Sequence, residues 1–342
     1  MIPERYNWEN FRGALFEPRK FFDEFKRIVN RIRHTPRELI FRFKYTSEFD
    51  IMKEDWDNLI ILDSCRFDVL DEMDLFENLS YKIMKSSTSE EFIEEYFENN
   101  GDFGDTIYIT ANPYGARVTD TFYKNVVTFD RKFTENGKKA KVDNLGKGWE
   151  PEIVFNTALR MYKENPDKRL IIHFMQPHSP YFGEKSRSLR EELREQGYEF
   201  WAWSDKLDRK DKSENDNVLY SLQEAAKLNI ITKGELYEIY KENILVVMEY
   251  VEKLSQEIKG KTIVTADHGE MLGDSRYFVP KNLSGLKNNM GHGDGIYVKE
   301  LRKVPWAVID NKERREIIDE GVNKSGDKDI NVENQLKALG YK

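Results

Sequence analysis

The sequence has a single cysteine, Cys65, so no disulfide bond can form within its 342 residues. A chain without disulfides is typical of a reducing compartment. No run approaches the roughly 20 apolar residues that a membrane-spanning helix needs, and no apolar stretch opens the chain as in a secretory signal. These absences predict a soluble, cytoplasmic protein.

The sequence also has no excess of basic residues, because 54 Lys and Arg stand against 62 Asp and Glu, for a net charge of -8. Proteins that coat nucleic acid usually present a basic surface, so nucleic acid is not expected as a partner. Hydrophobic residues make up 39% of the chain and aromatic residues 13%. This composition is sufficient for a sizeable core and predicts a folded protein.

Residues 1–50 differ from the rest of the chain. Between residues 18 and 33, apolar side chains recur at helical spacing and many basic side chains fall on the other face. The pattern predicts an amphipathic helical segment. It leaves three roles open, namely packing on the main domain, peripheral contact with a membrane surface or partner, and a mobile arm.

Residues 51–342 have the pattern of an α/β domain. Short apolar runs predict buried strands at 58–63, 106–110, 169–174, 261–266 and 304–309. Helical patterns lie between them at 89–99, 151–165 and 233–258. Strands that alternate with helices predict a mostly parallel central sheet with helices on both faces. The charged stretch 184–232, with Trp201 and Trp203, interrupts this rhythm and predicts a mostly helical insertion, such as a lid or substrate-selecting element.

Acidic and histidine residues follow several of the predicted strands. Asp63 ends the first, Asp267 and His268 follow the fourth, and His178 and His292 lie in loops. Ligands of open α/β sheets bind outside the carboxyl ends of the strands. A lone acid there is usually a helix cap or an ion-pair partner, but these five side chains can converge. Asp and His are ligands of Zn²⁺ and Mn²⁺, so one or two such ions are expected.

Three motifs occur in a characteristic order along residues 57–310. They are Leu59-Ile-Ile-Leu-Asp-Ser-Cys-Arg-Phe-Asp68, Val264-Thr-Ala-Asp-His-Gly-Glu-Met-Leu-Gly273, and Gly291-His292 followed by Val304-Pro305. Together they resemble the sulfatase-like branch of the alkaline phosphatase superfamily, and the Asp-His-Gly-Glu motif is the most specific of them. The resemblance implies an alkaline phosphatase-like α/β catalytic domain that acts on a phosphate or sulfate ester.

The resemblance also implies roles for individual residues. Asp63, Asp267 and His268 correspond to ligands of the main metal. His178 and His292 correspond to ligands of a second metal or to contacts with the charged oxygens of the substrate, and His178 is in addition a candidate catalytic residue. His173 lies inside a predicted strand, and a structural role is expected for it.

The segment Lys85-Ser-Ser-Thr-Ser-Glu-Glu-Phe92 resembles the nucleophile segment of lipoteichoic acid synthase-like and phosphoethanolamine transferase-like members. The resemblance implies Thr88 as nucleophile and metal contact, with Ser87 and Ser89 as alternatives. A helix N-terminus stabilises an anion, and a metal lowers the pKa of a hydroxyl. The plain alternative is that one of these residues only caps the helix, with Glu91 completing a capping box.

Other residues near the motifs have competing roles. Cys65 lacks the Cys-x-Pro-x-Arg context of formylglycine sulfatases, so it is predicted to be a packing residue. Arg66 is a candidate catalytic residue that either contacts the transferred group or forms an ion pair with Asp68. Asn112 follows the second predicted strand near the expected site, and its expected role is to shape the turn that precedes Pro113.

The sequence therefore predicts a metal-dependent hydrolase of phosphate mono- or diesters with a threonine nucleophile. Three alternatives remain, namely a phosphotransferase that modifies a glycan or lipid headgroup, a sulfate-ester hydrolase, and a non-catalytic descendant that binds an anion. The oligomeric state has no signature in the sequence.

Overall fold

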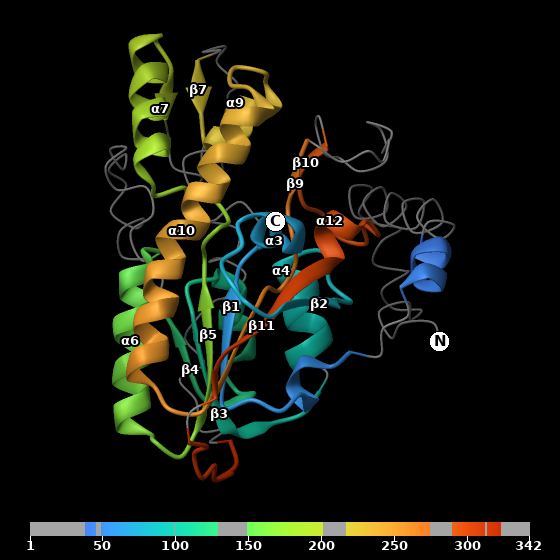
Figure 1. Cartoon of the computed structure of the whole chain (residues 1–342), viewed down its shortest axis with the longest axis vertical. Helices are drawn as coiled ribbons and strands as arrows, with labels where there is room; N and C mark the ends of the chain where they lie inside the picture. Colours follow the sequence, from blue (N-terminus) through green and yellow to red (C-terminus); the bar gives the residue numbers. More distant parts are fainter. Residues whose placement is uncertain are drawn as a thin grey trace, which may run out of the picture.

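The computed structural model describes residues 38–45, 49–98, 100–128, 149–200, 217–273, 289–311 and 313–322. Its centre is a seven-stranded sheet in the order β2-β11-β8-β1-β5-β3-β4 (Figure 1). The strands are β1 (Asn58–Leu62), β2 (Leu79–Ile83), β3 (Phe103–Thr110), β4 (Phe122–Val127), β5 (Arg169–Phe174), β8 (Lys261–Thr265) and β11 (Lys303–Asn311). Short two-stranded sheets are formed by β6 (Glu199–Phe200) with β7 (Val218–Leu219), and by β9 (Met271–Leu272) with β10 (Met290–Gly291).

The sheet is mixed but mostly parallel, which confirms the predicted fold class. Strand β1 pairs in parallel with β5 and β8, and β3 pairs in parallel with β4 and β5. Only β11 runs antiparallel to its neighbours in this sheet, β8 and β2. All five predicted strands are present. The edge strands β2 and β4 were not predicted, because their residues are largely half-buried or exposed and lack a continuous apolar run.

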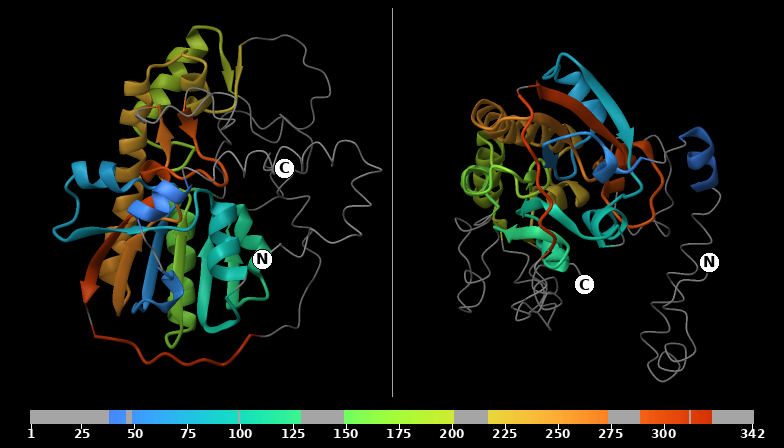
Figure 2. Two further views of the ribbon diagram at one scale, coloured as in Figure 1. Left: turned by 90° about the vertical axis from the view of Figure 1, so that its right-hand side faces the viewer. Right: turned by 90° about the horizontal axis from the view of Figure 1, so that it is seen from below.

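Helices cover both faces of the sheet (Figures 1 and 2). One face is covered by α6 (Pro151–Glu164) and α10 (Lys233–Glu257), and the other by α4 (Ser89–Ile93) with the π-helical turn η2 (Glu94–Glu98). The remaining helical elements are η1 (Ile51–Lys53), α3 (Phe67–Glu72), η3 (Pro113–Val118), α7 (Glu184–Glu195), α9 (Leu222–Lys227) and α12 (Lys299–Arg302). Because the sheet is covered on both faces, all five residues of β1 are buried.

The region predicted as a helical insertion contains α7, β6, β7 and α9, at the end of α10 that extends beyond the sheet (Figure 1). Trp201 and Trp203 lie outside the described residues, as does the predicted amphipathic segment 18–33. Residues 38–44 form a separate short helix near α12 (Figure 1). Its Phe41 ring is 5.9 Å from the ring of Tyr297.

After β11 the chain returns beneath the sheet, where residues 313–322 run along the amino ends of the strands (Figure 2). Arg315 donates hydrogen bonds to the carbonyl oxygens of Asp57 and Lys168. The Ile318 amide donates to Asp167, which precedes β5. This segment therefore covers the end of the sheet at which its parallel strands begin, opposite to their carboxyl ends.

Candidate metal centre

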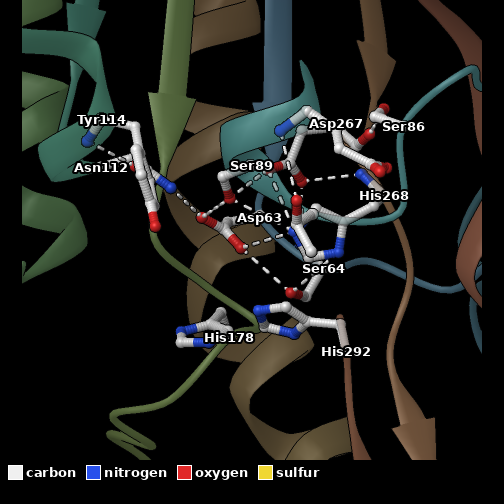
Figure 3. Close-up of polar contacts among 12 residues, drawn as sticks. Asp63, Ser64, Ser86, Ser89, Asn112, Tyr114, His178, Asp267, His268 and His292 are labelled. Atoms are coloured by element: carbon white, nitrogen blue, oxygen red, sulfur yellow. Dashed lines mark hydrogen bonds and ion pairs between the residues drawn. The ribbon is translucent and has the colours of Figure 1, made fainter. Parts of the chain in front are cut away.

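Asp63 and Asp267 meet because their strands are neighbours. Asp63 directly follows β1, Asp267 follows β8, and these two strands pair in parallel. The Ser64 amide donates to Oδ1 of Asp267 at 3.0 Å, and the Ser64 hydroxyl donates to Oδ1 of Asp63 at 3.0 Å (Figure 3). Ser64 has a φ of 62°, a conformation that non-glycine residues adopt at a cost and often at functional sites. The backbone here is shaped to hold two carboxylates together.

The Ser89 hydroxyl points at this carboxylate pair. Its Oγ is 2.7 Å from Oδ2 of Asp267 and 3.3 Å from Oδ2 of Asp63 (Figure 3). It is also 3.2 Å from Nε2 of His268. Ser89 is the first residue of α4, so this helix carries the hydroxyl into the site.

His268 presents one ring nitrogen to the same site. Its Nδ1 donates to the carbonyl oxygen of Gly269 at 2.7 Å, which leaves Nε2 as the ring nitrogen that can bind a metal. Nε2 is 3.4 Å from Oδ2 of Asp267 and 3.9 Å from Oδ1 of Asp63. Glycine is needed at position 269, because a Cβ there would overlap the carbonyl oxygen of Glu300.

His173, for which a structural role was expected, reaches this site from inside β5. Its Nε2 is 3.7 Å from Oδ2 of both Asp63 and Asp267. The ring is fully buried, and burial lowers its pKa to about 4, so it is neutral near pH 7. This location is not predictable from the sequence, because strand position alone does not show which face a side chain occupies.

The two buried carboxylates interact strongly. Burial, and then the charge of Asp267, raise the pKa of Asp63 to about 8. Burial acts in the same direction on Asp267, but His268, His173 and the Ser89 hydroxyl outweigh it and lower the pKa of that carboxyl. One carboxyl of the pair therefore holds a proton near neutral pH, and a bound divalent cation would replace it. Two carboxylates, two imidazoles and a hydroxyl are a donor set that fits such an ion.

A second cluster consists of His178, Glu270 and His292, whose potential ligand atoms lie within 4.8 Å of one another. His178 donates from Nδ1 to the Ser179 carbonyl at 2.6 Å, which leaves the lone pair on Nε2. His292 Nδ1 is 3.3 Å from Oε1 of Glu270. Burial acts to raise the pKa of Glu270, but His292 and His178 outweigh it and lower this pKa to about 2, so Glu270 is ionised. Glu270 belongs to the Asp-His-Gly-Glu motif but was not predicted as a ligand.

The two clusters adjoin each other (Figure 3). The ring centroids of His268 and His292 are 4.5 Å apart, and those of His178 and His292 are 5.3 Å apart. The structure thus brings together all the predicted Asp and His ligands. The class of site that results is a pair of adjacent carboxylate and histidine clusters at the carboxyl ends of a mostly parallel sheet.

Thr88, the predicted nucleophile, faces other partners. Its hydroxyl donates to Oδ1 of Asp294 at 2.8 Å and accepts from the Glu91 amide at 3.2 Å. The second contact makes Thr88 the N-cap of α4. The Ser87 hydroxyl lies 2.8 Å from the Glu91 carboxylate and 2.9 Å from the carbonyl oxygen of Gly293, and it can donate to either. Of the three hydroxyl residues, Ser89 has the hydrogen bonds to the Asp63 and Asp267 carboxylates.

Arg66 and Asn112 have defined contacts. The Arg66 guanidinium donates two hydrogen bonds to the Asp68 carboxylate, at 3.0 and 2.6 Å, which is the ion pair considered from the sequence. The Asn112 side chain shapes its turn by accepting from the Tyr114 amide at 2.9 Å. It also donates to Oδ2 of Asp63 at 2.6 Å, a contact with the site that was not predicted (Figure 3). The Cys65 side chain is buried in the core.

Comparison with protein-family models and with curated proteins finds no match. Among solved structures, the chain is similar to the C-terminal periplasmic domain of EcEptC from Escherichia coli in complex with Zn, at 12% identity and a TM-score of 0.41, over 75% of this chain and 74% of that one. It is similar to a protein in the alkaline phosphatase superfamily from Vibrio parahaemolyticus, at 13% identity and a TM-score of 0.36, over 78% and 62% of the chains. It is also similar to the lipoteichoic acid synthase LtaP from Listeria monocytogenes, at 15% identity and a TM-score of 0.36, over 73% and 64% of the chains.

These neighbours agree with the resemblance to sulfatase-like members of the alkaline phosphatase superfamily that the sequence motifs indicated. All three TM-scores are below 0.5, so the residue roles rest on distances within this chain. The predicted cytoplasmic location is wrong by the same comparison, because the Escherichia coli neighbour is a periplasmic domain. Within the described ranges, no helix has the length and hydrophobicity to cross a membrane.

Proposed function

We propose that this protein is a metal-dependent enzyme that acts on phosphate esters and uses the Ser89 hydroxyl as its nucleophile. One observation carries the proposal, namely that Ser89 Oγ contacts Asp267, Asp63 and His268 at 2.7, 3.3 and 3.2 Å. A hydroxyl among metal-ligating side chains at a helix N-terminus is the arrangement expected of an activated nucleophile.

Ser89 is proposed here in place of Thr88, whose role as nucleophile remains a prediction. The Asp267 carboxylate lies at 2.7 Å from Ser89 Oγ, within reach of the hydroxyl proton. The Thr88 hydroxyl is instead engaged with Asp294 and with the first turn of α4. The one-residue difference matters because Thr88 is the N-cap with an extended backbone, whereas Ser89 is the first helical residue, so the two side chains point in different directions.

Asp63, Asp267 and His268 would hold the cation beside Ser89. When bound, a divalent ion supplies positive charge that lowers the pKa of the hydroxyl and neutralises charge on the transferred group. Ser89 would form the bond to phosphorus while the leaving oxygen departs, and water or an acceptor alcohol would then release the group. Asn112 would orient Asp63 throughout. The donor set suits Zn²⁺ or Mn²⁺.

His178, Glu270 and His292 are proposed to hold a second ion or to contact the leaving oxygen. The His292 ring centroid is 4.5 Å from that of His268, and this closeness to the main site supports the proposal. We propose residues 51–342 as the catalytic domain, with the region 184–232 as an insertion that contributes to substrate choice. Arg66 is buried and paired with Asp68, and this pair supports a positioning role.

The test is a screen of chromogenic phosphomonoesters, phosphodiesters and sulfate esters, with Zn²⁺, Mn²⁺ and Mg²⁺ added in turn to metal-free protein. Metal-dependent turnover of a phosphate ester that is lost in Ser89→Ala supports the proposal. Turnover of sulfate esters but not of phosphate esters would contradict the proposal and identify the protein as a sulfate-ester hydrolase. Protein that binds no divalent metal and turns over none of the esters would contradict the proposal and favour a non-catalytic role.

A transferase that modifies a lipid headgroup is the second candidate function. The helix at 38–44 exposes Leu39, Ile40 and Phe43 by 63%, 69% and 91%, and it also carries Arg42 and Lys44. An apolar face next to basic residues suits the surface of an anionic bilayer. Transfer of phosphoryl groups to an added alcohol, together with sedimentation on anionic but not neutral vesicles, would favour this candidate. Release of phosphate alone without vesicle binding would favour the hydrolase.

A further inference from the structure

His173 is a buried polar residue, and within the described part of the chain one of its ring nitrogens is not satisfied by a hydrogen bond. The side chain is 0% exposed and belongs to β5. In the sheet, β1 lies between β5 and β8. The His173 Nδ1 faces the Tyr108 hydroxyl at 2.9 Å. Among the residues that the structure describes, its Nε2 has no hydrogen-bond partner. Most buried polar atoms in folded proteins are satisfied, so an unsatisfied nitrogen directed at two carboxylates requires an explanation.

The distances around Nε2 are too long for hydrogen bonds but suit a shared cation. Nε2 is 3.7 Å from Oδ2 of Asp63 and 3.7 Å from Oδ2 of Asp267. Hydrogen bonds from nitrogen to oxygen span roughly 2.7–3.2 Å. Two ligand atoms that are each ~2.1 Å from one metal ion lie roughly 3–4.2 Å apart, depending on the angle between the two bonds. We propose that His173 is a ligand of the cation held by Asp63 and Asp267, and that Tyr108 is a positioning residue that fixes the His173 ring.

The contact between His173 and Tyr108 supports the form of the ring that can bind a metal. For Nε2 to bind a metal, Nδ1 must carry the proton and donate it to the Tyr108 oxygen. The Tyr108 oxygen can accept this proton, because a phenol hydroxyl both donates and accepts. Metal-binding histidines usually have such a partner on the second nitrogen.

The packing around His173 keeps the ring in place. The Phe92 ring lies 6.3 Å away at 71°, and the Tyr108 ring lies 6.2 Å away at 31°. Phe92 belongs to α4, the helix that carries Ser89. The same packing unit therefore positions the proposed nucleophile and the proposed extra ligand. This inference rests on the proposed metal-dependent function but makes a separate statement about which side chains bind the ion.

The experiment compares Zn²⁺ affinity, by competition with a chromophoric chelator, among wild-type protein, His173→Gln, Tyr108→Phe and Tyr162→Phe. The Tyr162 hydroxyl accepts a hydrogen bond from the Lys259 amide, remote from the carboxylates, so it is the matched control. We expect Tyr108→Phe to weaken binding about 10–100-fold, as is typical for loss of an outer partner of a metal ligand. His173→Gln should weaken it further, and Tyr162→Phe should leave it unchanged. Visible spectra of the Co²⁺-loaded proteins should change in His173→Gln and not in Tyr162→Phe.

The outcomes separate this inference from the proposed function. Wild-type protein that binds metal, with equal affinity and equal Co²⁺ spectra in His173→Gln and Tyr108→Phe, overturns the role of His173 alone. Wild-type protein that binds no divalent metal overturns the proposed function and this inference together. If His173→Gln fails to fold, Tyr108→Phe decides, because it removes one oxygen atom and leaves the ring packing in place.

Discussion

The Ser89 hydroxyl lies 2.7 Å from the carboxylate of Asp267, although the two residues are 178 positions apart in the chain. The contact joins the first residue of α4 to the segment that follows β8. It differs from the contacts of the adjacent Thr88, whose hydroxyl is directed to Asp294. The pair Thr88 and Ser89 therefore offers a direct test of which hydroxyl acts.

Ser89→Ala should reduce turnover by about three orders of magnitude or more, because it removes the attacking atom. Thr88→Ala removes the N-cap of α4 and should cost about 1 kcal/mol of stability while retaining most activity. Initial rates with a phosphate ester, and urea unfolding curves of both variants, give the comparison. Loss of activity in Thr88→Ala with full activity in Ser89→Ala would return the nucleophile to Thr88.

Glu270→Gln should remove one of two bound ions. The carboxylate is buried, ionised and directed at His292, so its neutral replacement leaves two histidines as the remaining ligands. Metal analysis of dialysed protein should show two equivalents in the wild type and one in the variant. Asp267→Asn is the matched control for the main site. Unchanged metal content in Glu270→Gln would exclude Glu270 as a ligand.

Asn112→Ala should weaken metal binding about 10–100-fold without changing the number of ions. The Asn112 amide donates to Oδ2 of Asp63 at 2.6 Å and holds this carboxylate toward Asp267. Isothermal titration with Zn²⁺ measures the effect. Asn125→Ala is a suitable control, because the Asn125 amide donates to the Gly115 carbonyl in the same region but has no contact with either carboxylate. Equal affinities in both variants would contradict the proposed positioning.

Asp55→Asn should destabilise the protein at neutral pH but not at low pH. Hydrogen bonds from Arg314 and Lys261 lower the pKa of Asp55 to about 2, below its ordinary value of 3.8. The stabilising contribution is therefore present above about pH 4 and disappears as the pH falls toward 2. Because the pair is exposed, the difference in unfolding free energy should not exceed about 1 kcal/mol. Urea unfolding between pH 7 and pH 3 should show the gap between variant and wild type narrowing, and a gap that widens on acidification would refute the assignment.

Cys65 should be unreactive in the folded protein. The side chain is 0% exposed, and burial raises the pKa of its thiol, so little thiolate is available. A chromogenic disulfide reagent should label no thiol under native conditions and one equivalent after unfolding in guanidinium, since the chain has one cysteine. Rapid labelling of the native protein would show that the loop after β1 opens readily.

The sequence predicts the central strands because they are buried on both faces and read as continuous apolar runs. Strand β1, with the sequence Asn-Leu-Ile-Ile-Leu, is the clearest example. The edge strand β2 escapes prediction, because Ser80 and Tyr81 are exposed and no apolar run remains. Its pairing with β11 is a long-range contact that no local pattern reports.

Site residues at the ends of strands are predictable from the sequence. Contacts that depend on the orientation of a side chain are not. Asp63 and Asp267 are found because the carboxyl ends of neighbouring parallel strands share one edge. The closeness of His173 to Asp63 is not predicted, because its position inside β5 does not show which way its ring points. The orientation of Ser89 depends on where α4 begins, and sequence patterns place helix ends only to within one or two residues.

The return of the chain beneath the sheet, at residues 313–322, separates two tasks in space. Arg315 and Ile318 form hydrogen bonds at the amino ends of the strands. Asp63 and Asp267 lie at the carboxyl ends. Substitution of Arg315 should lower the melting temperature with little effect on the rate of turnover. Substitution of Asp63 or Asp267 should lower the rate of turnover with little effect on the melting temperature. Thermal stability and catalytic activity therefore depend on separate sets of residues at opposite ends of the sheet.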